Sequence, residues 1–181
     1  MREQGIDNND IDNDVFLKAL QATLKDKRLK WDEQQAQIYV MKKIQEIQAK
    51  QAKKLEKEHQ QFFEKNAKKK GMVLLPSGIQ YTILKEGSGK AVKADDTIQV
   101  HYTGTLVDGS VFDSSVARDK PATLGVYQVI SGWQEILPKM NVGSKWKIFI
   151  PPSLGYGAKQ AGIIPPHSIL IFEIEVLSIE R

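Results

Sequence analysis

Residues 32 to 70 contain no Gly and no Pro, and this uninterrupted run constrains the fold more than any other feature of the sequence. It predicts one helix of about 39 residues, roughly 58 Å long at 1.5 Å per residue, with Gly71 as its C-terminal stop. Such a helix is too long for the interior of a small domain. We therefore interpret residues 1–75 as a helical domain in which this helix forms an arm, preceded by a short helix over 15–24.

The apolar residues of the long helix lie mainly between Ile38 and Ile47, and they thin out before Phe62 and Phe63. The first half thus has an apolar face that needs a partner, whereas the second half is typical of an exposed arm. Helices from two chains are the simplest cover for this face, although its pattern is too irregular for a heptad coiled coil. We expect a homodimer through residues 1–50.

From Leu75 onward the apolar period changes to two residues, and all seven prolines of the chain lie beyond this point. Apolar and polar side chains alternate in four segments, at residues 79–83, 98–102, 146–150 and 170–176. This alternation is typical of half-buried strands in an antiparallel sheet. Asp108-Gly109 adds the signal of a hairpin turn. Residues 76–181 are therefore predicted to form a second domain.

One short helix is expected among these strands, in the stretch VISGWQEIL that begins at Val129. Ser131 is able to cap its start, and Pro138 limits it to about six or seven residues. A helix this short buries little by itself, so we interpret Trp133 as one wall of another feature. The sequence thus predicts an α+β fold in which an antiparallel sheet folds over one short helix.

Several functional classes are not supported by the sequence. Cysteine is absent, which excludes disulfides and thiol catalysis, and no stretch approaches the roughly 20 apolar residues that a membrane span needs. The formal net charge of +4 reflects Lys mixed with Glu and Gln along the long helix, without Arg clusters, so no nucleic-acid partner is expected. Three histidines lack companions at metal-ligand spacing, and two serines lack a nearby base: His59, His101, His167, Ser114 and Ser115. We expect no metal, no cofactor and no hydrolase triad.

Aromatic and aliphatic side chains gather beside the expected turns of the C-terminal domain. They are Tyr102, Phe112, Val129, Ile130, Trp133, Tyr156 and Phe172. They fit two interpretations: an ordinary core or, because turns lie at surfaces, an open apolar pocket with a few polar groups at its rim. The pattern alone leaves both open.

Four motifs occur in this region in a fixed order: VHYTGTLVDGSVFDSS, VISGW, LGYG and GIIPPHSILIFEIEVL. In this order and spacing they resemble the FKBP-type peptidyl-prolyl cis-trans isomerases, over nearly all of residues 78–180. The early QGID, the long Lys/Gln/Glu helix and VLLPSGIQY are similar to the bacterial macrophage infectivity potentiator group. The resemblance implies a curved antiparallel sheet wrapped around one short helix, and isomerase activity.

The resemblance also implies a proline-binding pocket with Trp133 as its floor. The backbone N–H of Ile130 and the Tyr156 hydroxyl would donate to substrate carbonyls, and Asp113 would be the carboxylate at the rim. The implied catalytic residues are Asp113, Tyr156 and Tyr102. The implied substrate-binding residues are Phe112, Arg118, Val129, Ile130, Trp133, Ile164 and Phe172. Inhibitors of the tacrolimus and rapamycin type are implied as ligands, with one wall lowered where many relatives have side chains larger than Ala122 and Leu124.

We expect an isomerase that assists the folding of unfolded or proline-containing polypeptides by binding the twisted X-Pro amide. The alternative is a dimeric holdase chaperone in which isomerisation is incidental. The resemblance predicts a location in the periplasm or outer envelope of a bacterium, with the leader absent from this chain. A cytoplasmic location is the alternative, because the polar start MREQGIDNNDIDND lacks the apolar core of a signal peptide.

Overall fold

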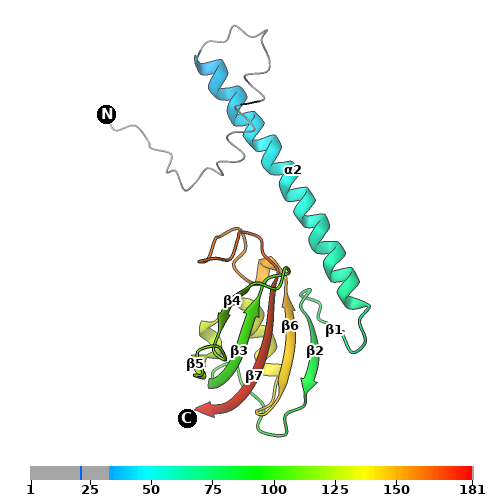
Figure 1. Ribbon diagram of the computed structural model, residues 1–181, viewed down its shortest axis with the longest axis vertical. Coiled ribbons are helices and arrows are strands. Elements are labelled where there is room, and N and C mark those ends of the chain that lie inside the picture. Colours follow the sequence, from blue (N-terminus) through cyan, green and yellow to red (C-terminus); the bar gives the residue numbers. More distant parts are fainter. Residues whose placement is uncertain (1–20, 22–32, 181) are drawn as a thin grey trace, which may run out of the picture. The chain divides into compact units, whose positions relative to one another are not determined.

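The computed structural model describes residues 21 and 33–180 (Figure 1). Contacts divide the chain into two compact units, one that ends at Glu58 and one that begins at His59. The short helix predicted over 15–24 lies outside the described residues except for Gln21, which is helical. The second unit holds the described strands and the candidate site.

A long helix, α2, runs from Glu33 to Ala67 and confirms the predicted arm helix. It ends before residue 70 because the chain turns there, with the Lys69 N–H donating to the Asn66 carbonyl at 3.0 Å. Gly71 follows with φ of 77°, a conformation that favours glycine. Within residues 33–180, no helix has both the length and the apolar character needed to cross a membrane.

The second unit is built on a seven-stranded antiparallel sheet (Figure 1). Its strands are β1 (Val73–Leu74), β2 (Gln80–Lys85), β3 (Thr97–Thr105), β4 (Val111–Ser114), β5 (Ala122–Gly125), β6 (Lys145–Ile150) and β7 (Leu170–Glu180). Neighbours follow the order β1-β2-β6-β7-β3-β4, and β5 pairs with β3. The predicted antiparallel sheet and the hairpin at Asp108-Gly109, which joins β3 to β4, are confirmed.

The predicted alternation holds well in β7 and less well in β2. In β7 the buried side chains are Leu170, Phe172, Ile174 and Val176, and their neighbours are half-buried. In β2, however, Ile83 is 38% exposed although the pattern predicts that it faces the core. The reason is that β1 pairs only with Gln80 and Tyr81, so Ile83 lies on an open edge of the sheet.

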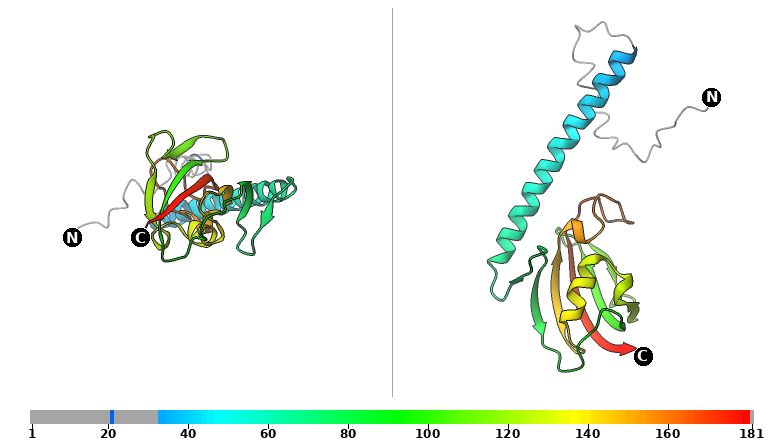
Figure 2. Two further views of the ribbon diagram at one scale, coloured as in Figure 1. Left: turned by 90° about the horizontal axis from the view of Figure 1, so that it is seen from below. Right: turned by 180° about the vertical axis from the view of Figure 1, so that it is seen from behind.

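The short helix α3 spans Ser131–Ile136 and is followed by a 3-10 turn over Leu137–Lys139, which confirms its predicted length. Trp133 and Ile136 are buried against one face of the sheet, where α3 lies in Figure 2. The prediction that Ser131 caps this helix was wrong, because Ile130 is the N-cap and no side chain caps the helix. The Ile130 carbonyl instead accepts from the Trp133 N–H at 2.9 Å.

The end of α2 is attached to the other face of the sheet through two buried amide side chains. Asn66 Nδ2 donates to Gln80 Oε1 at 2.8 Å, and Gln80 Nε2 donates to the Phe63 carbonyl at 2.9 Å. The Phe62 ring lies beside Phe149 of β6, with the ring centroids 6.1 Å apart. Periodicity does not predict this attachment, because Asn and Gln at these positions resemble ordinary exposed residues.

We expect residues 59–70 to stabilise the sheet measurably. A fragment 71–181 keeps β1 but uncovers Phe149 and loses both hydrogen bonds of Gln80, so it should unfold more easily than a fragment 59–181. Re-exposing one buried aromatic side chain costs about 1.5–3 kcal/mol. Urea unfolding followed by tryptophan fluorescence measures the difference, and equal midpoints for the two fragments would show that the attachment is not stabilising.

Candidate active site

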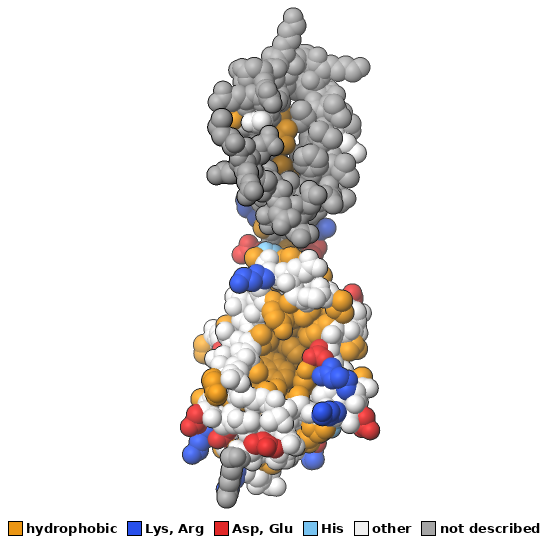
Figure 3. Space-filling model, turned by 90° about the vertical axis from the view of Figure 1, so that its left-hand side faces the viewer, with side chains coloured by type: hydrophobic (Ala, Val, Ile, Leu, Met, Phe, Trp, Pro, Cys, Tyr) orange, Lys and Arg blue, Asp and Glu red, His pale blue; other side chains and the backbone are white. Residues whose placement is uncertain are grey.

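A cleft of about 570 Å³ opens on one face of the second unit. Figure 3 shows it as a hydrophobic hollow with acidic and basic side chains at one side. Its walls come from β3, β4, the segment from Leu124 to Trp133, the loop from Tyr156 to Ile164, and β7. Its lining comprises Tyr102, Phe112, Asp113, Leu124, Gln128, Val129, Ile130, Trp133, Tyr156, Ala161, Ile164 and Phe172. Every site residue singled out from the sequence is among them except Arg118, which contacts the lining residue Asp113.

Trp133 meets two aromatic rings edge to face, and one of these two meets a third. The Trp133 ring lies 5.3 Å from Tyr102 and 5.1 Å from Phe172 between centroids, at interplanar angles of 87° and 82°. Phe112 meets Phe172 in the same manner at 5.4 Å. Edge-to-face pairs are favourable beyond the area they bury, so the rings hold one another in place. The floor of the cleft is apolar apart from the Trp133 Nε1, which is buried and has no hydrogen-bond partner among the described residues.

Gly104 on β3 allows two of these rings to approach the sheet. A Cβ atom at this position would lie 2.5 Å from the Phe112 ring and 2.9 Å from the Phe172 ring. Real Cβ atoms do not come this close to other heavy atoms, so a larger residue would push the rings into the cleft. The shape of the cleft therefore depends on a glycine that the sequence did not single out.

At the rim, Tyr102, Asp113 and Arg118 form a polar cluster. The Tyr102 hydroxyl and the Arg118 guanidinium each donate a hydrogen bond to Asp113, and Arg118 also donates to the Tyr102 oxygen at 3.3 Å. Burial and the bond to Asp113 raise the pKa of Tyr102 above its ordinary value. Burial alone would raise the pKa of Asp113, but the bonds from Arg118 and Tyr102 outweigh it, and the pKa is lowered. Asp113 is thus a carboxylate at neutral pH.

Two serines hold this rim in position. The Ser115 hydroxyl accepts from the Tyr102 N–H at 2.8 Å, and the Ser115 N–H donates to the Tyr102 carbonyl at 3.0 Å. The Ser114 hydroxyl accepts from the Ala117 N–H at 3.1 Å, in the turn that leads to Arg118. His101 Nδ1 also lies 3.1 Å from the Ser115 hydroxyl, but Ser115 is fully buried, so this pair is closed to substrates.

The Ile130 N–H and the Tyr156 hydroxyl are donors at the cleft that have no hydrogen-bond partner in the described part of the chain. The Ile130 N–H, just before α3, is not used in any backbone hydrogen bond there. The Tyr156 ring is 40% exposed, and no hydrogen bond within residues 33–180 involves its hydroxyl. Both donors are therefore available to a bound molecule. Gln134 supports this wall by donating to the Val129 carbonyl at 2.7 Å.

The described residues contain no group of three or more His, Cys, Asp or Glu side chains that could hold a metal ion. The cleft offers an apolar floor, one carboxylate and several hydrogen-bond donors. It therefore suits an uncharged, compact apolar group flanked by carbonyl oxygens.

Comparison with known proteins assigns the chain to a family. The family of FKBP-type peptidyl-prolyl cis-trans isomerases matches residues 88–177, and the domain amino terminal to FKBP-type peptidyl-prolyl isomerase matches residues 1–83. Outer membrane protein MIP of Legionella longbeachae is 39% identical over 188 residues, which cover 99% of this chain and 79% of that protein. The chain belongs to the FKBP family.

Other relatives agree with this assignment. The FKBP-type isomerase FkpA of Aeromonas hydrophila is 41% identical over 177 residues, which cover 94% of this chain and 66% of that protein. The crystal structure of FkpA from Escherichia coli matches with a TM-score of 0.70 at 34% identity, over 94% of this chain and 83% of that chain. The chain thus spans only part of the length of some relatives, about two thirds in the case of the Aeromonas protein.

The sequence of this FKBP did not single out two residues of the lining, Gln128 and Ala161. Leu124 was noted only as smaller than its counterparts, and it does lie in the wall. Ala122, two positions earlier on β5, instead packs against the hydrophobic core. Alternation along β5 does not separate these two residues, because side chains two apart on a strand lie on the same face.

The lowered pKa of Asp113 predicts a pH dependence of stability. Because this pKa is lower in the folded chain than in the unfolded chain, the carboxylate stabilises the fold above about pH 4, and the contribution is lost as the pH falls through the folded-state pKa. In Asp113→Asn, the decline of the unfolding midpoint between neutral and acidic pH should be smaller than in the unmodified chain.

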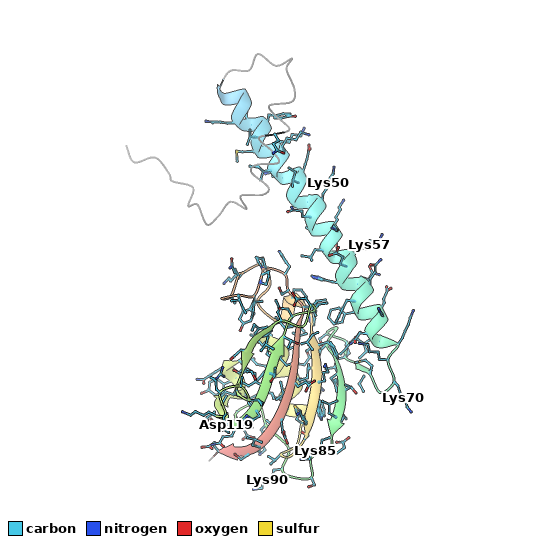
Figure 4. All side chains as sticks on the ribbon, in the orientation of Figure 1. Lys50, Lys57, Lys70, Lys85, Lys90 and Asp119 are labelled. Carbon is cyan, nitrogen blue, oxygen red and sulfur yellow. The ribbon has the colours of Figure 1, made fainter. Side chains whose placement is uncertain are left out.

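The matched control is Asp119→Asn, which removes an exposed carboxylate from the turn that follows β4 (Figure 4). No hydrogen bond in the described chain links the Asp119 side chain to Tyr102 or Arg118. Urea midpoints at several pH values measure the effect. Identical pH profiles for Asp113→Asn and the unmodified chain would contradict the role of this carboxylate.

Proposed function

We propose that this FKBP catalyses rotation about X-Pro bonds by holding the prolyl residue in the cleft, with its ring on Trp133. The observation that carries the proposal is the apolar floor built from Trp133, Phe112 and Phe172, beside the unused Ile130 N–H. The pyrrolidine ring is compact and apolar, and carbonyl oxygens lie on both sides of it. In this proposal the Ile130 N–H and the Tyr156 hydroxyl, which both line the cleft, donate to those oxygens.

No bond has to be broken in this reaction. Rotation about the X-Pro bond costs roughly 18–20 kcal/mol because amide resonance is lost in the twisted state. The planar amide is more charge-separated than the twisted amide, so an apolar cleft that excludes water favours the twisted state. Catalysis is then differential binding of a conformation, and each 1.4 kcal/mol or so of preference gives a factor of ten in rate. Tyr102, Asp113 and Arg118 supply a fixed polar rim on one side of this apolar site.

We expect the rim and the Tyr156 hydroxyl to contribute to turnover. Tyr156→Phe removes one hydrogen bond to the bound amide, worth about 0.5–1.5 kcal/mol, so kcat/KM should fall about 2- to 10-fold. Asp113→Ala leaves Tyr102 and Arg118 without their shared acceptor and should cost at least as much. Protease-coupled isomerisation of a Leu-Pro or Phe-Pro peptide measures both effects.

Tyr127→Phe is the matched control, because it removes the hydroxyl of a tyrosine that is 62% exposed and does not line the cleft. Its kcat/KM should equal that of the unmodified chain. Undiminished turnover in both Tyr156→Phe and Asp113→Ala would remove these two residues from the mechanism.

A second function, that of a dimeric holdase, is favoured by the surface of α2. Ile38 and Met41 lie one turn apart and are 63% and 64% exposed. We propose that the helices of two chains pair through residues 1–50, so that two clefts act on one unfolded client and raise its effective concentration. The division into an arm domain 1–75 and an isomerase domain 76–181 belongs to this proposal. Two family matches, one ending at residue 83 and one beginning at residue 88, support a division into two domains, whereas the contacts divide the chain after Glu58.

Replacing both exposed residues tests the pairing. Ile38→Glu/Met41→Glu should convert a dimer to a monomer in analytical ultracentrifugation, because four carboxylates would be buried in the interface. Peptide turnover should remain, whereas suppression of aggregation of an unfolded protein should decrease. Gln51→Glu/Gln61→Glu adds the same charge at exposed polar positions of α2 that lie away from the Ile38 and Met41 face, and it should leave the dimer intact. A dimer that survives the first pair of changes would exclude this interface.

The location and the ligands of the cleft complete the proposal. The name of the Legionella relative, an outer membrane protein, supports a periplasmic or outer-envelope location for this chain as well. Tacrolimus- and rapamycin-type inhibitors would occupy the proline site, with the Leu124 side of the cleft giving less contact than a larger side chain would.

A further inference from the structure

Lysines on α2 lie on one side of the helix between residues 42 and 57. They are Lys42, Lys43, Lys50, Lys53, Lys54 and Lys57. At about 100° per residue all six fall within an arc of about 120°. Lys50 and Lys57 project from the same side of the helix in Figure 4. We call these six residues the lysine stripe.

Few of these charges are neutralised within the chain. Glu46 is the one acidic residue inside the arc, and it pairs with Lys43 at 2.7 Å. Glu58, outside it, lies 3.8 Å from Lys54. No ion pair within the described residues involves the other four lysines of the stripe, which are all exposed. The stripe therefore presents concentrated positive charge to solvent.

This arrangement differs from an ordinary solvated helix face, where acidic and basic residues alternate at three- and four-residue spacing. Lys53 and Lys54 lie three and four residues after Lys50, and the same two lysines lie four and three residues before Lys57. Glu46 and Glu56 are the acidic residues at these spacings from Lys50 and Lys53. Like charges at these spacings destabilise a helix by a few tenths of a kcal/mol each. The opposite side of the helix carries uncharged residues over the same range: Ile44, Gln45, Gln48, Gln51, Ala52 and Leu55. Helix stability does not favour positive charge gathered on one side of α2, whereas binding to an anionic partner would use it.

We propose that the lysine stripe docks the helix on the anionic surface of a lipid bilayer, through the phosphate groups of its lipids. The complementarity is one of charge and shape: a straight helix spanning about 22 Å presents its ammonium groups along one side, and a flat anionic surface reaches all of them together. Lysine clusters on a helix bind such surfaces, with each lysine strengthening binding about fivefold. This contact lies at the surface and needs no membrane-spanning segment.

Other polyanions fit the stripe less well. It contains no arginine, the residue that recognises nucleic-acid phosphates bidentately, and no aromatic ring on which a base could stack. An acidic segment of an unfolded polypeptide would have to become ordered along the whole stripe, which opposes binding. A bilayer surface requires no such ordering.

The test is co-sedimentation of the full-length chain with lipid vesicles. One set consists of phosphatidylcholine with roughly a third phosphatidylglycerol, and the other of phosphatidylcholine alone. The unmodified chain should sediment with the anionic vesicles at low salt and be released at high salt. In Lys50→Gln/Lys53→Gln/Lys57→Gln, the partition coefficient should fall on the order of 10- to 100-fold. Gln has nearly the helix propensity of Lys, and circular dichroism verifies that helix content is retained.

The matched control, Lys90→Gln/Lys93→Gln/Lys139→Gln, removes the same charge from the second unit, where Figure 4 labels Lys90. It should bind vesicles nearly as the unmodified chain does. Three results would overturn the proposal: equal loss in both triple variants, equal binding to the uncharged vesicles, or capture by duplex DNA through the stripe without capture by anionic vesicles. Equal loss in both variants would mean that binding depends only on net charge. Equal binding to uncharged vesicles would mean apolar adsorption, and capture by DNA alone would mean that the stripe binds nucleic acid.

Discussion

The close approach of α3 to the sheet is the contact on which the candidate site depends. A Cβ atom on Gly132 would lie 2.6 Å from the Ile150 side chain, so only glycine lets the helix come this near. Trp133, the next residue, then meets Phe172 and Tyr102 edge to face and closes the bottom of the cleft. Pro138 lies in the 3-10 turn that ends the helix. A longer helix was not needed, because α3 serves mainly to place one ring and one free backbone N–H.

The polar rim depends in turn on the β3–β4 hairpin. Asp113 pairs with Gly104 across the two strands, so the residue that makes room for the aromatic rings also sets the position of the carboxylate. Ser115 fixes the backbone of Tyr102 by two hydrogen bonds. Phe112 of the apolar floor and Asp113 of the charged rim are thus adjacent residues of β4, and they move together if that strand moves.

The fold was largely predictable because alternation and glycine- and proline-free runs are local properties of the sequence. The long helix, the antiparallel strands and the short helix around Trp133 all follow from them. The site was predictable only as far as motifs resembled a known family, since the pattern alone left a core and a pocket open. What could not be read were contacts across the fold: the Asn66–Gln80 pair joins polar residues that look exposed, and the Ser131 cap failed because the carbonyl of Ile130 already begins the helix. The one-sidedness of the lysines on α2 was present in the sequence, but it was interpreted there as a solvated face.

The central claim, that the prolyl residue binds on Trp133 beside the Ile130 N–H, is tested most directly by NMR titration of the ¹⁵N-labelled chain with a proline-containing peptide. The account predicts that the Trp133 indole N–H and the Ile130 amide shift together and saturate with the same dissociation constant. The indole N–H signal of Trp146 should not shift, because this ring is buried, stacks on Tyr81 and does not line the cleft. Saturable binding that leaves the Trp133 and Ile130 signals unmoved would contradict the account.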